Sequence, residues 1–278
     1  MNYVIISDSS SDVLEISNVN YQTVPLKIIT SEKEFVDDKH LDLEEMVGYL
    51  REYNGRSGSA CPNVQEWQDA FGDADAIFCI TITSNLSGSY NTADSALKEH
   101  LENYPERKGV VIDSLSTGPE MALIIEKLIS LIGEGLEFEE ISQRINEYKN
   151  TTHLLFGLES LHNLAANGRI SGVSSKIAGI LGIRVVGKAS NEGTLEMLSK
   201  VRGGEKMISC IMEQLEVNGY SGGAVRIHHC ANKAATVKLI NKIKEKYPDA
   251  DVKFRRTKGL CSFYAERGGL LVGFEKGI

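Results

Sequence analysis

Cysteine is scarce and scattered in this 278-residue chain, and no two cysteines are spaced as C-x-x-C. The closely spaced pairs that hold zinc and the dense cysteine frameworks of small secreted proteins are therefore both missing. An odd number of separate thiols is typical of a protein kept in a reducing cytosol. The five cysteines are Cys61, Cys79, Cys210, Cys230 and Cys261.

Positive charge is also in short supply, because 30 Lys and Arg residues face 38 Asp and Glu residues, for a net charge of -8. This balance disfavours nucleic acid or an anionic membrane surface as a partner. No apolar run approaches the ~20 residues that a membrane-spanning helix needs. Residues 1–3 lead directly into a strand-like segment at 4–6 without a basic leader. We therefore expect a soluble, cytoplasmic protein.

Motifs that bind phosphate or activate a serine are missing as well. The segment Ser57–Ser59 lacks the spacing and the lysine of a P-loop, and G-x-G-x-x-G follows none of the expected strands. The G-x-S-x-G elbow of many hydrolases is absent, and no Asp–His pair is marked by a motif. A serine hydrolase acting on acyl substrates, with Ser84 or Ser87 as nucleophile, remains an alternative that fluorophosphonate labelling would reveal.

Buried strands alternate with helices along the first half of the chain. The apolar segments at 3–7, 76–80 and 109–112 each stop at Ser, Thr or Asp, and a helix is expected after each. This alternation is typical of a parallel α/β sheet. Ligands of such sheets bind beyond the carboxyl ends of the strands. We therefore expect one polar edge formed by Ser9–Ser11, Thr83–Ser89 and Asp113–Ser116.

Periodicity and capping residues assign most of the remaining elements. We expect helices near 42–53, 64–71, 119–132, 138–148, 160–164, 205–218 and 231–247. We expect strands near 24–29, 152–158, 183–188, 195–201, 223–229, 252–256 and 270–274. The pattern changes after residue 148, so we place a domain boundary near 150. This gives an N-terminal α/β domain of residues 1–150 and a C-terminal α/β domain of residues 151–278.

The stretch from Thr83 to Ser89 is the leading candidate site. It places four hydroxyl side chains and Gly88 between a buried strand and a helix. The first turn of a helix carries unpaired N–H groups and partial positive charge, which suits a bound oxyanion. The alternative is an ordinary cap rich in Ser and Asn.

Two other candidate sites have simpler explanations. Asp8 and Asp113 could act as general acid and base, but each is better explained as a cap for the helix that follows it. The pair His228-His229 looks like a metal site. Adjacent side chains of a strand point to opposite faces, however, so the two histidines cannot chelate one ion. A single histidine in a pocket or in the core is the favoured interpretation.

Several motifs follow the order found in the DegV family of fatty-acid-binding proteins, also called FakB-type proteins. Asp8–Asp12 resembles the opening D-S-[TS]-[SA]-D of that family, and Ser59–Pro62 stands where the family has T-S-Q-P. Residues 83–90 resemble S-S-x-L-S-G-T-Y, the most specific motif of the set. Further similarities occur at 111–114, 167–170, 200–202, 229–232 and 268–274, so the resemblance covers the whole chain.

The resemblance implies a two-domain α/β fold. Its N-terminal domain has a mostly parallel sheet with helices on both faces, and the lipid site lies between this domain and the C-terminal one. One long-chain fatty acid would be held with its carboxylate in a Ser-rich crevice and its tail in an apolar tunnel. The resemblance also implies a carrier that needs no cofactor or metal and is not an enzyme. Such a carrier would present the acid to a fatty-acid kinase for acyl-phosphate formation, as part of phospholipid metabolism.

Site residues are carried over from the family by position. The carboxylate-binding positions are Ser59, Ser84, Ser87, Gly88 and Tyr264. The crevice-lining positions are Asp8, Ser9, Ser10, Asp113 and Ser114. Arg169 and Arg202 would contact the kinase, with ordinary surface charge as the alternative. Tyr264 stands where the family has a histidine. We expect its hydroxyl to donate to the carboxylate, and the alternative is that its ring only packs at the domain junction.

Overall fold

The computed structural model describes residues 2–170 and 182–277. A four-stranded parallel sheet forms from the first half of the chain, in the order β2-β1-β6-β7. Its strands are β1 (Tyr3–Asp8), β2 (Tyr21–Val24), β6 (Ala76–Thr81) and β7 (Lys108–Asp113). All six residues of β6 are buried, as expected for a strand covered on both faces. The predicted parallel sheet with helices on both faces is confirmed.

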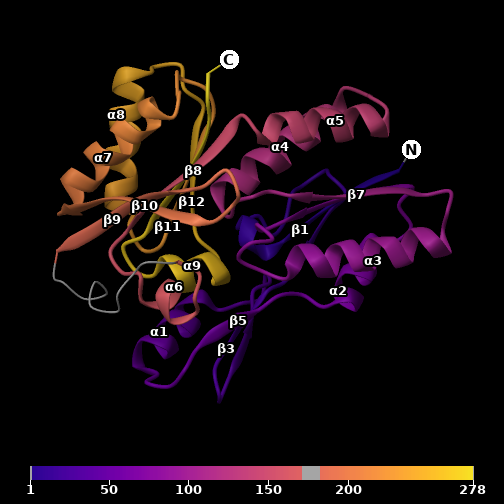
Figure 1. The fold of residues 1–278 in the computed structure, drawn as a ribbon, viewed down its shortest axis with the longest axis horizontal. Helices are drawn as coiled ribbons and strands as arrows, with labels where there is room; N and C mark the ends of the chain where they lie inside the picture. Colours follow the sequence, from indigo (N-terminus) through magenta and orange to yellow (C-terminus); the bar gives the residue numbers. More distant parts are fainter. Residues whose placement is uncertain (1, 171–181, 278) are drawn as a thin grey trace.

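Alternating side chains of the parallel sheet enter two separate cores. Val4 and Ile6 of β1 pack with Trp67 under α2 (Val64–Phe71) and α3 (Ser89–Asn103). Ile5, between them, packs on the opposite face with Ile124 of α4 (Pro119–Gly133) and with α5 (Phe138–Lys149). In Figure 1, α3 lies below this sheet, and α4 and α5 lie above it. The two-residue period of a strand therefore divides the hydrophobic residues between the two layers.

A six-stranded mixed sheet forms from the second half of the chain, in the order β10-β9-β8-β13-β11-β12. Neighbouring strands run antiparallel except for β11 and β12, which are parallel. Helices α7 (Gly204–Val217) and α8 (Lys233–Lys246) cover the outer face, at the left of Figure 1. The strands are β8 (Thr152–Leu158), β9 (Ile183–Ala189), β10 (Leu195–Arg202), β11 (Val225–His229), β12 (Val252–Arg256) and β13 (Leu270–Glu275).

Helix α4 lies between the two sheets, because it packs against β6 on one side and against β8, β11 and β13 on the other. Gly273 of β13 makes this contact possible. A Cβ atom at Gly273 would lie only 2.5 Å from the amide nitrogen of Glu120 in the first turn of α4. The first sheet is built from residues before 150 and the second from residues after 150. The division into 1–150 and 151–278 itself stays a prediction.

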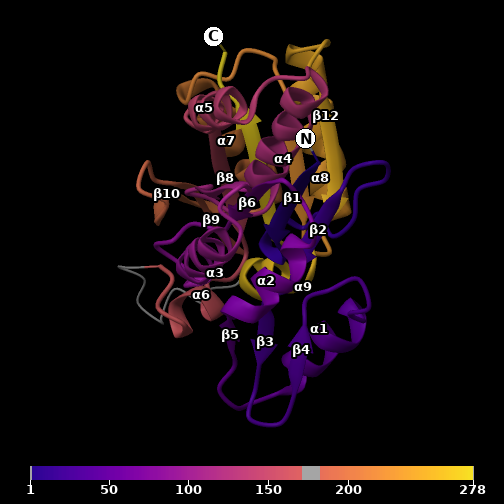
Figure 2. The ribbon, with the colours of Figure 1, turned by 90° about the vertical axis from the view of Figure 1, so that its right-hand side faces the viewer.

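A third, small antiparallel sheet has the order β4-β3-β5 and is accompanied by α1 (Leu43–Glu52). Its strands are β3 (Lys27–Ile29), β4 (Glu34–Val36) and β5 (Gly58–Ala60). Figure 2 shows α1, β3 and β4 together as a separate layer below the rest of the molecule. The single strand expected at 24–29 was wrong, because the chain leaves β2 at Val24 and begins β3 at Lys27. Asp42 caps α1 by accepting from the amide of Glu45 at 3.0 Å.

Four further short elements were not expected from the sequence. They are the 3-10 turn η1 (Ser9–Ser11), strands β4 and β5, and helix α9 (Gly259–Ala265). Helix α6 (His162–Ala166) was expected, and it ends at Asn167 and Gly168, where Gly168 has a φ of +68°. No helix of the described residues is long and apolar enough to cross a membrane.

Candidate functional site

An apolar cavity of about 640 Å³, its open mouth included, is lined by residues from both halves of the chain. Leu26 and Ile82 come from the N-terminal half, whereas Phe156 of β8 and Leu271 of β13 come from the six-stranded sheet. We call this space the apolar cavity. Its full lining is Leu26, Ser59, Ile82, Leu86, Ser87, Thr117, Leu154, Phe156, Leu158, Leu164, Arg169, Leu195, Leu260, Cys261, Tyr264, Ala265 and Leu271. Such a space suits an apolar ligand with few polar groups.

Two hydroxyl groups meet in the wall of the apolar cavity. The side-chain oxygens of Ser59 on β5 and Tyr264 on α9 lie 2.7 Å apart and share a hydrogen bond. Both residues are half-buried. The aromatic ring of Tyr264 also packs edge-on against Phe263, with ring centroids 4.8 Å apart. Each hydroxyl can turn its proton toward an anionic ligand, so this pair is a candidate contact for a carboxylate.

Helix α9 supplies four lining residues, and a buried carboxylate holds its first turn. Asp37, fully buried, accepts from the amides of Gly259 at 2.6 Å and Leu260 at 2.9 Å. Burial raises the pKa of Asp37 to about 7, and hydrogen bonds from these amides oppose the shift. The acceptor comes from the loop after β4, so the small sheet sets the position of α9. Asp37 therefore anchors the helix that carries Tyr264.

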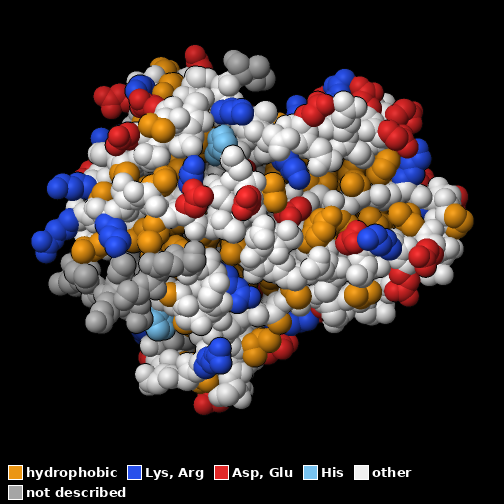
Figure 3. All heavy atoms as spheres, in the orientation of Figure 1, with side chains coloured by type: hydrophobic (Ala, Val, Ile, Leu, Met, Phe, Trp, Pro, Cys, Tyr) orange, Lys and Arg blue, Asp and Glu red, His pale blue; other side chains and the backbone are white. Residues whose placement is uncertain are grey.

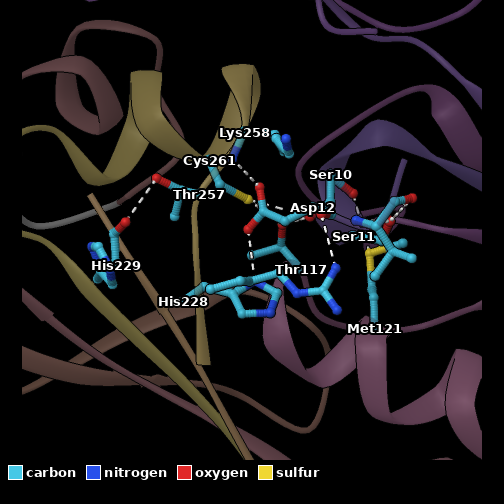
Figure 4. A network of polar contacts seen from close by, with 12 residues as sticks. Ser10, Ser11, Asp12, Thr117, Met121, His228, His229, Thr257, Lys258 and Cys261 are labelled. Atoms are coloured by element: carbon cyan, nitrogen blue, oxygen red, sulfur yellow. Dashed lines mark hydrogen bonds and ion pairs between the residues drawn. The ribbon is translucent and has the colours of Figure 1, made fainter. Parts of the chain in front are cut away.

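A buried network of polar contacts joins Asp12 to β11 and to the beginning of α9 (Figure 4). Nδ1 of His228 lies 2.7 Å from Oδ2 of Asp12, and both side chains are excluded from solvent. The amide of Lys258 donates to Oδ1 of Asp12 at 2.6 Å. Burial lowers the pKa of His228, and Asp12 opposes that shift. The Cys261 thiol donates to the carbonyl of Ser10 at 3.2 Å. These contacts tie the end of β1 to β11 and α9.

The histidine pair is divided as the strand geometry predicts. His228 points to Asp12, whereas Nδ1 of His229 accepts from the amide of Asn232 at 3.3 Å. Among the residues that the structure describes, no group of three or more His, Cys, Asp or Glu side chains could hold a metal ion.

Asp8, Ser9 and Ser10 are placed in the protein interior and outside the lining of the apolar cavity. The Asp8 carboxylate accepts from the amide of Ile82 at 2.8 Å and from the Ser89 hydroxyl at 2.7 Å. Ser9 accepts from the amide of Leu26 at 3.0 Å. Their polar groups satisfy one another and the neighbouring strand ends. In this structure the three residues lie outside the cavity lining, and their place in a ligand crevice stays a prediction.

Ser84, Gly88 and Asp113 also lie outside the cavity lining. Ser84 is exposed, and its amide donates to both oxygens of Asp113 at 3.3 Å. Gly88 is exposed at the beginning of α3. Of the predicted Thr83–Ser89 hydroxyls, only Ser87 lines the apolar cavity, together with the neighbouring Leu86. Ser84 is therefore an exposed loop residue in this structure, and its role as a carboxylate contact stays a prediction.

Ser114 is buried and lines a different cavity, together with Glu120 and Lys149. The two arginines are placed differently from each other. Arg169 is half-buried in the lining of the apolar cavity, and its Nε donates to the carbonyl of Leu86 at 3.2 Å. Arg202 is exposed at the end of β10. Figure 3 shows basic side chains gathered at the left edge of the molecule, over the end of β10 and the beginning of α7.

The family model described as an uncharacterised protein of the DegV family matches residues 2–276. A DegV domain-containing protein of Streptococcus pneumoniae is 43% identical over 279 residues, which cover 99% of each chain. Two solved structures are also similar. A DegV family protein from Eubacterium eligens loaded with heptadecanoic acid is 44% identical, with a TM-score of 0.96 over 99% of this chain and 100% of that one. The Streptococcus pneumoniae Fatty Acid Kinase (Fak) B3 protein loaded with linoleic acid is 43% identical, with a TM-score of 0.97 over all of both chains.

Proposed function

The chain belongs to the DegV family, and from this premise we propose that it is a carrier for one long-chain fatty acid. The tail occupies the apolar cavity, and the carboxylate lies at the Ser59–Tyr264 hydroxyl pair with Ser87 and Arg169 nearby. The observation that carries the proposal is an apolar cavity whose wall contains two hydrogen-bonded hydroxyls. Fatty acids bound to the two similar solved structures support it.

The tail supplies most of the affinity in this proposal. Burying ~14 methylenes at ~0.8 kcal/mol each yields on the order of 11 kcal/mol before the cost of ordering is subtracted. A hydrogen bond to the charged head contributes about 1.5–3 kcal/mol. The head contacts therefore set orientation, while the cavity sets affinity.

The carrier presents the carboxyl group to a fatty-acid kinase for acyl-phosphate formation. The name of the similar pneumococcal protein, Fatty Acid Kinase B3, supports this partner. We assign the exposed Arg202 to the kinase-facing surface and Arg169 to the cavity entrance beside the head group. This carrier acts in the cytoplasm, and its five unpaired cysteines suit a reducing compartment.

The carrier is not a catalyst and takes no cofactor in this proposal. Nothing in the comparisons supports the serine hydrolase alternative. A catalytic Ser–His pair requires a hydrogen bond between the two side chains. In the described part of the chain, no histidine side chain forms such a bond with Ser84 or Ser87.

Displacement of a fluorescent fatty acid from delipidated protein tests the proposal. We expect long-chain fatty acids to displace the probe at a stoichiometry of one per chain. Octanoic acid serves as the matched short-chain control, and it should displace the probe far more weakly because it buries fewer methylenes. Equal displacement by the short and long acids would contradict the proposal.

A further inference from the structure

A second cavity with polar walls lies at the other end of β8 from the hydroxyl pair. We call it the polar chamber. Figure 1 shows α6 and α9 near one end of β8 and the C-terminus of the chain beyond the other end. Asn163, which follows β8, donates to the carbonyl of Phe263 at 2.7 Å, so the end of β8 lies beside Tyr264. The chamber is lined by Ser114, Leu115, Glu120, Lys149, Asn150, Thr152, His153, Leu154, Ala189, Ser190, Asn191 and Lys276.

One face of β8 connects the two cavities. Phe156 and Leu158 line the apolar cavity, Thr152 lines the polar chamber, and Leu154 lines both. These side chains alternate along the strand and therefore share a face. At ~3.3 Å per residue, Thr152 lies about 20 Å from Leu158. The far end of the apolar cavity is thus closed by Leu154, with polar groups directly behind it.

The polar chamber carries positive charge in a chain of net charge -8. Lys149 and Lys276 both line it, and within the described ranges 2–170 and 182–277 neither lies within ion-pair distance of a carboxylate. The ammonium group of Lys149 donates to the carbonyl of Asp113 at 2.9 Å. Burial lowers the pKa of Lys149, and burial with Lys276 and Lys188 lowers that of His153. An anion in the chamber would oppose both shifts, because it favours the charged form of each group.

Glu120 faces the same space from the first turn of α4. It is buried, and the Thr152 hydroxyl donates to it at 2.7 Å. Burial raises the pKa of Glu120 to about 7, while the hydroxyls of Ser116 and Thr152 oppose the shift. Burial therefore favours the protonated form of Glu120, which can donate a hydrogen bond to a ligand oxygen.

We propose that the polar chamber binds an oxyanion, a phosphate or carboxylate group, between Lys149, Lys276 and Glu120. The lysines supply charge-assisted hydrogen bonds, and the protonated Glu120 donates to an oxygen of the anion. Two sources share this chemistry. One is dissolved inorganic phosphate. The other is the distal carboxylate of a long-chain dicarboxylic acid whose chain displaces the Leu154 side chain, and this second source rests on the proposed function.

Titration with inorganic phosphate, followed by calorimetry, tests the first source. We expect saturable binding to the parent protein and binding at least tenfold weaker in Lys149→Met. Lys242→Met removes the same charge from an exposed position on α8, outside the chamber, and should bind phosphate like the parent. If Lys149→Met does not fold, phosphate binding is measured in Lys276→Met, because Lys276 is exposed. Binding should again be at least tenfold weaker than in the parent.

Comparison of hexadecanedioic acid with palmitic acid tests the second source. A preference for the dicarboxylic acid that Lys149→Met abolishes, with palmitic acid binding unchanged, would assign the chamber to a distal carboxylate. The proposal is overturned if neither phosphate nor the dicarboxylic acid shows binding that depends on Lys149 or Lys276. Failure of palmitic acid to bind the parent would instead contradict the carrier function, and the phosphate titration would still decide the chamber.

Discussion

Replacing Tyr264 with phenylalanine removes the tyrosine hydroxyl from the Ser59–Tyr264 pair. Of the hydroxyls assigned to the head group, only those of serine then remain. The ring should stay in place, because it packs against Phe263 and belongs to the core around α9. The variant therefore tests the hydrogen bond and leaves the fold intact. Ser59 keeps its hydroxyl and remains available to the ligand.

The size of the effect follows from the contacts of the free protein. A hydrogen bond from Tyr264 to a carboxylate contributes about 1.5–3 kcal/mol. Where Tyr264 is the donor in its 2.7 Å bond to Ser59, the parent protein gives up that bond on binding, a loss of about 0.5–1.5 kcal/mol. The net loss in Tyr264→Phe should be about 1–2 kcal/mol, or about 5- to 30-fold in Kd.

The assay is displacement of a fluorescent fatty acid from delipidated protein. Tyr104→Phe is the matched control, because Tyr104 lies 45% exposed at the end of α3 and outside the cavity lining. Ser59→Ala should weaken binding by an amount similar to that of Tyr264→Phe. An affinity for Tyr264→Phe within about twofold of the parent would refute the head-group assignment and favour a packing role for the ring.

Three further predictions concern other groups of the site. Asp37→Ala leaves the amides of Gly259 and Leu260 without their acceptor. Urea denaturation should show a free energy of unfolding lower by on the order of 1–3 kcal/mol per amide. Unchanged stability would contradict the anchoring role of Asp37. Glu120 has a folded-state pKa raised to about 7, so its contribution to stability is present at pH 4 and is lost as the pH rises through 7. Glu120→Gln should therefore flatten the fall in Tm between pH 5 and pH 8, and an unchanged slope would exclude Glu120 as its source. Arg202→Ala should leave lipid content unchanged and slow acyl phosphorylation by a cognate kinase. Arg169→Ala should slow phosphorylation and also weaken fatty-acid binding. Loss of lipid in Arg202→Ala would contradict the surface role of Arg202.

Long periodic segments could be predicted from the sequence because their own residues determine burial. Strand β6 is apolar throughout and is covered on both faces, and α4 is so apolar that only a site between layers can bury it. Strand β5 and helix α9 could not be predicted, because distant partners form them. Ser59 is in a strand because it pairs with Ile28, and α9 is capped by Asp37 from far along the chain.

Only part of the candidate site could be predicted, because a sequence pattern does not show how polar groups pair in the folded chain. The sequence predicts that Ser9–Ser11 and Thr83–Ser89 share one sheet edge. In the structure the Ser89 hydroxyl donates to Asp8, the residue before Ser9, at 2.7 Å. A pattern of hydroxyls cannot show whether such groups satisfy one another or remain open to a ligand. Asp8 and Ser89 satisfy each other in the interior, whereas Ser59 and Tyr264 face the cavity. Which set contacts a ligand depends on tertiary packing that no local motif records.

Native mass spectrometry of the protein purified from cells, before and after solvent extraction, tests the carrier function most directly. The account predicts a mass excess equal to one long-chain fatty acid per chain, which extraction removes and added fatty acid restores. A protein that carries no acyl chain as purified, and gains none when long-chain fatty acid is supplied, would contradict the central claim.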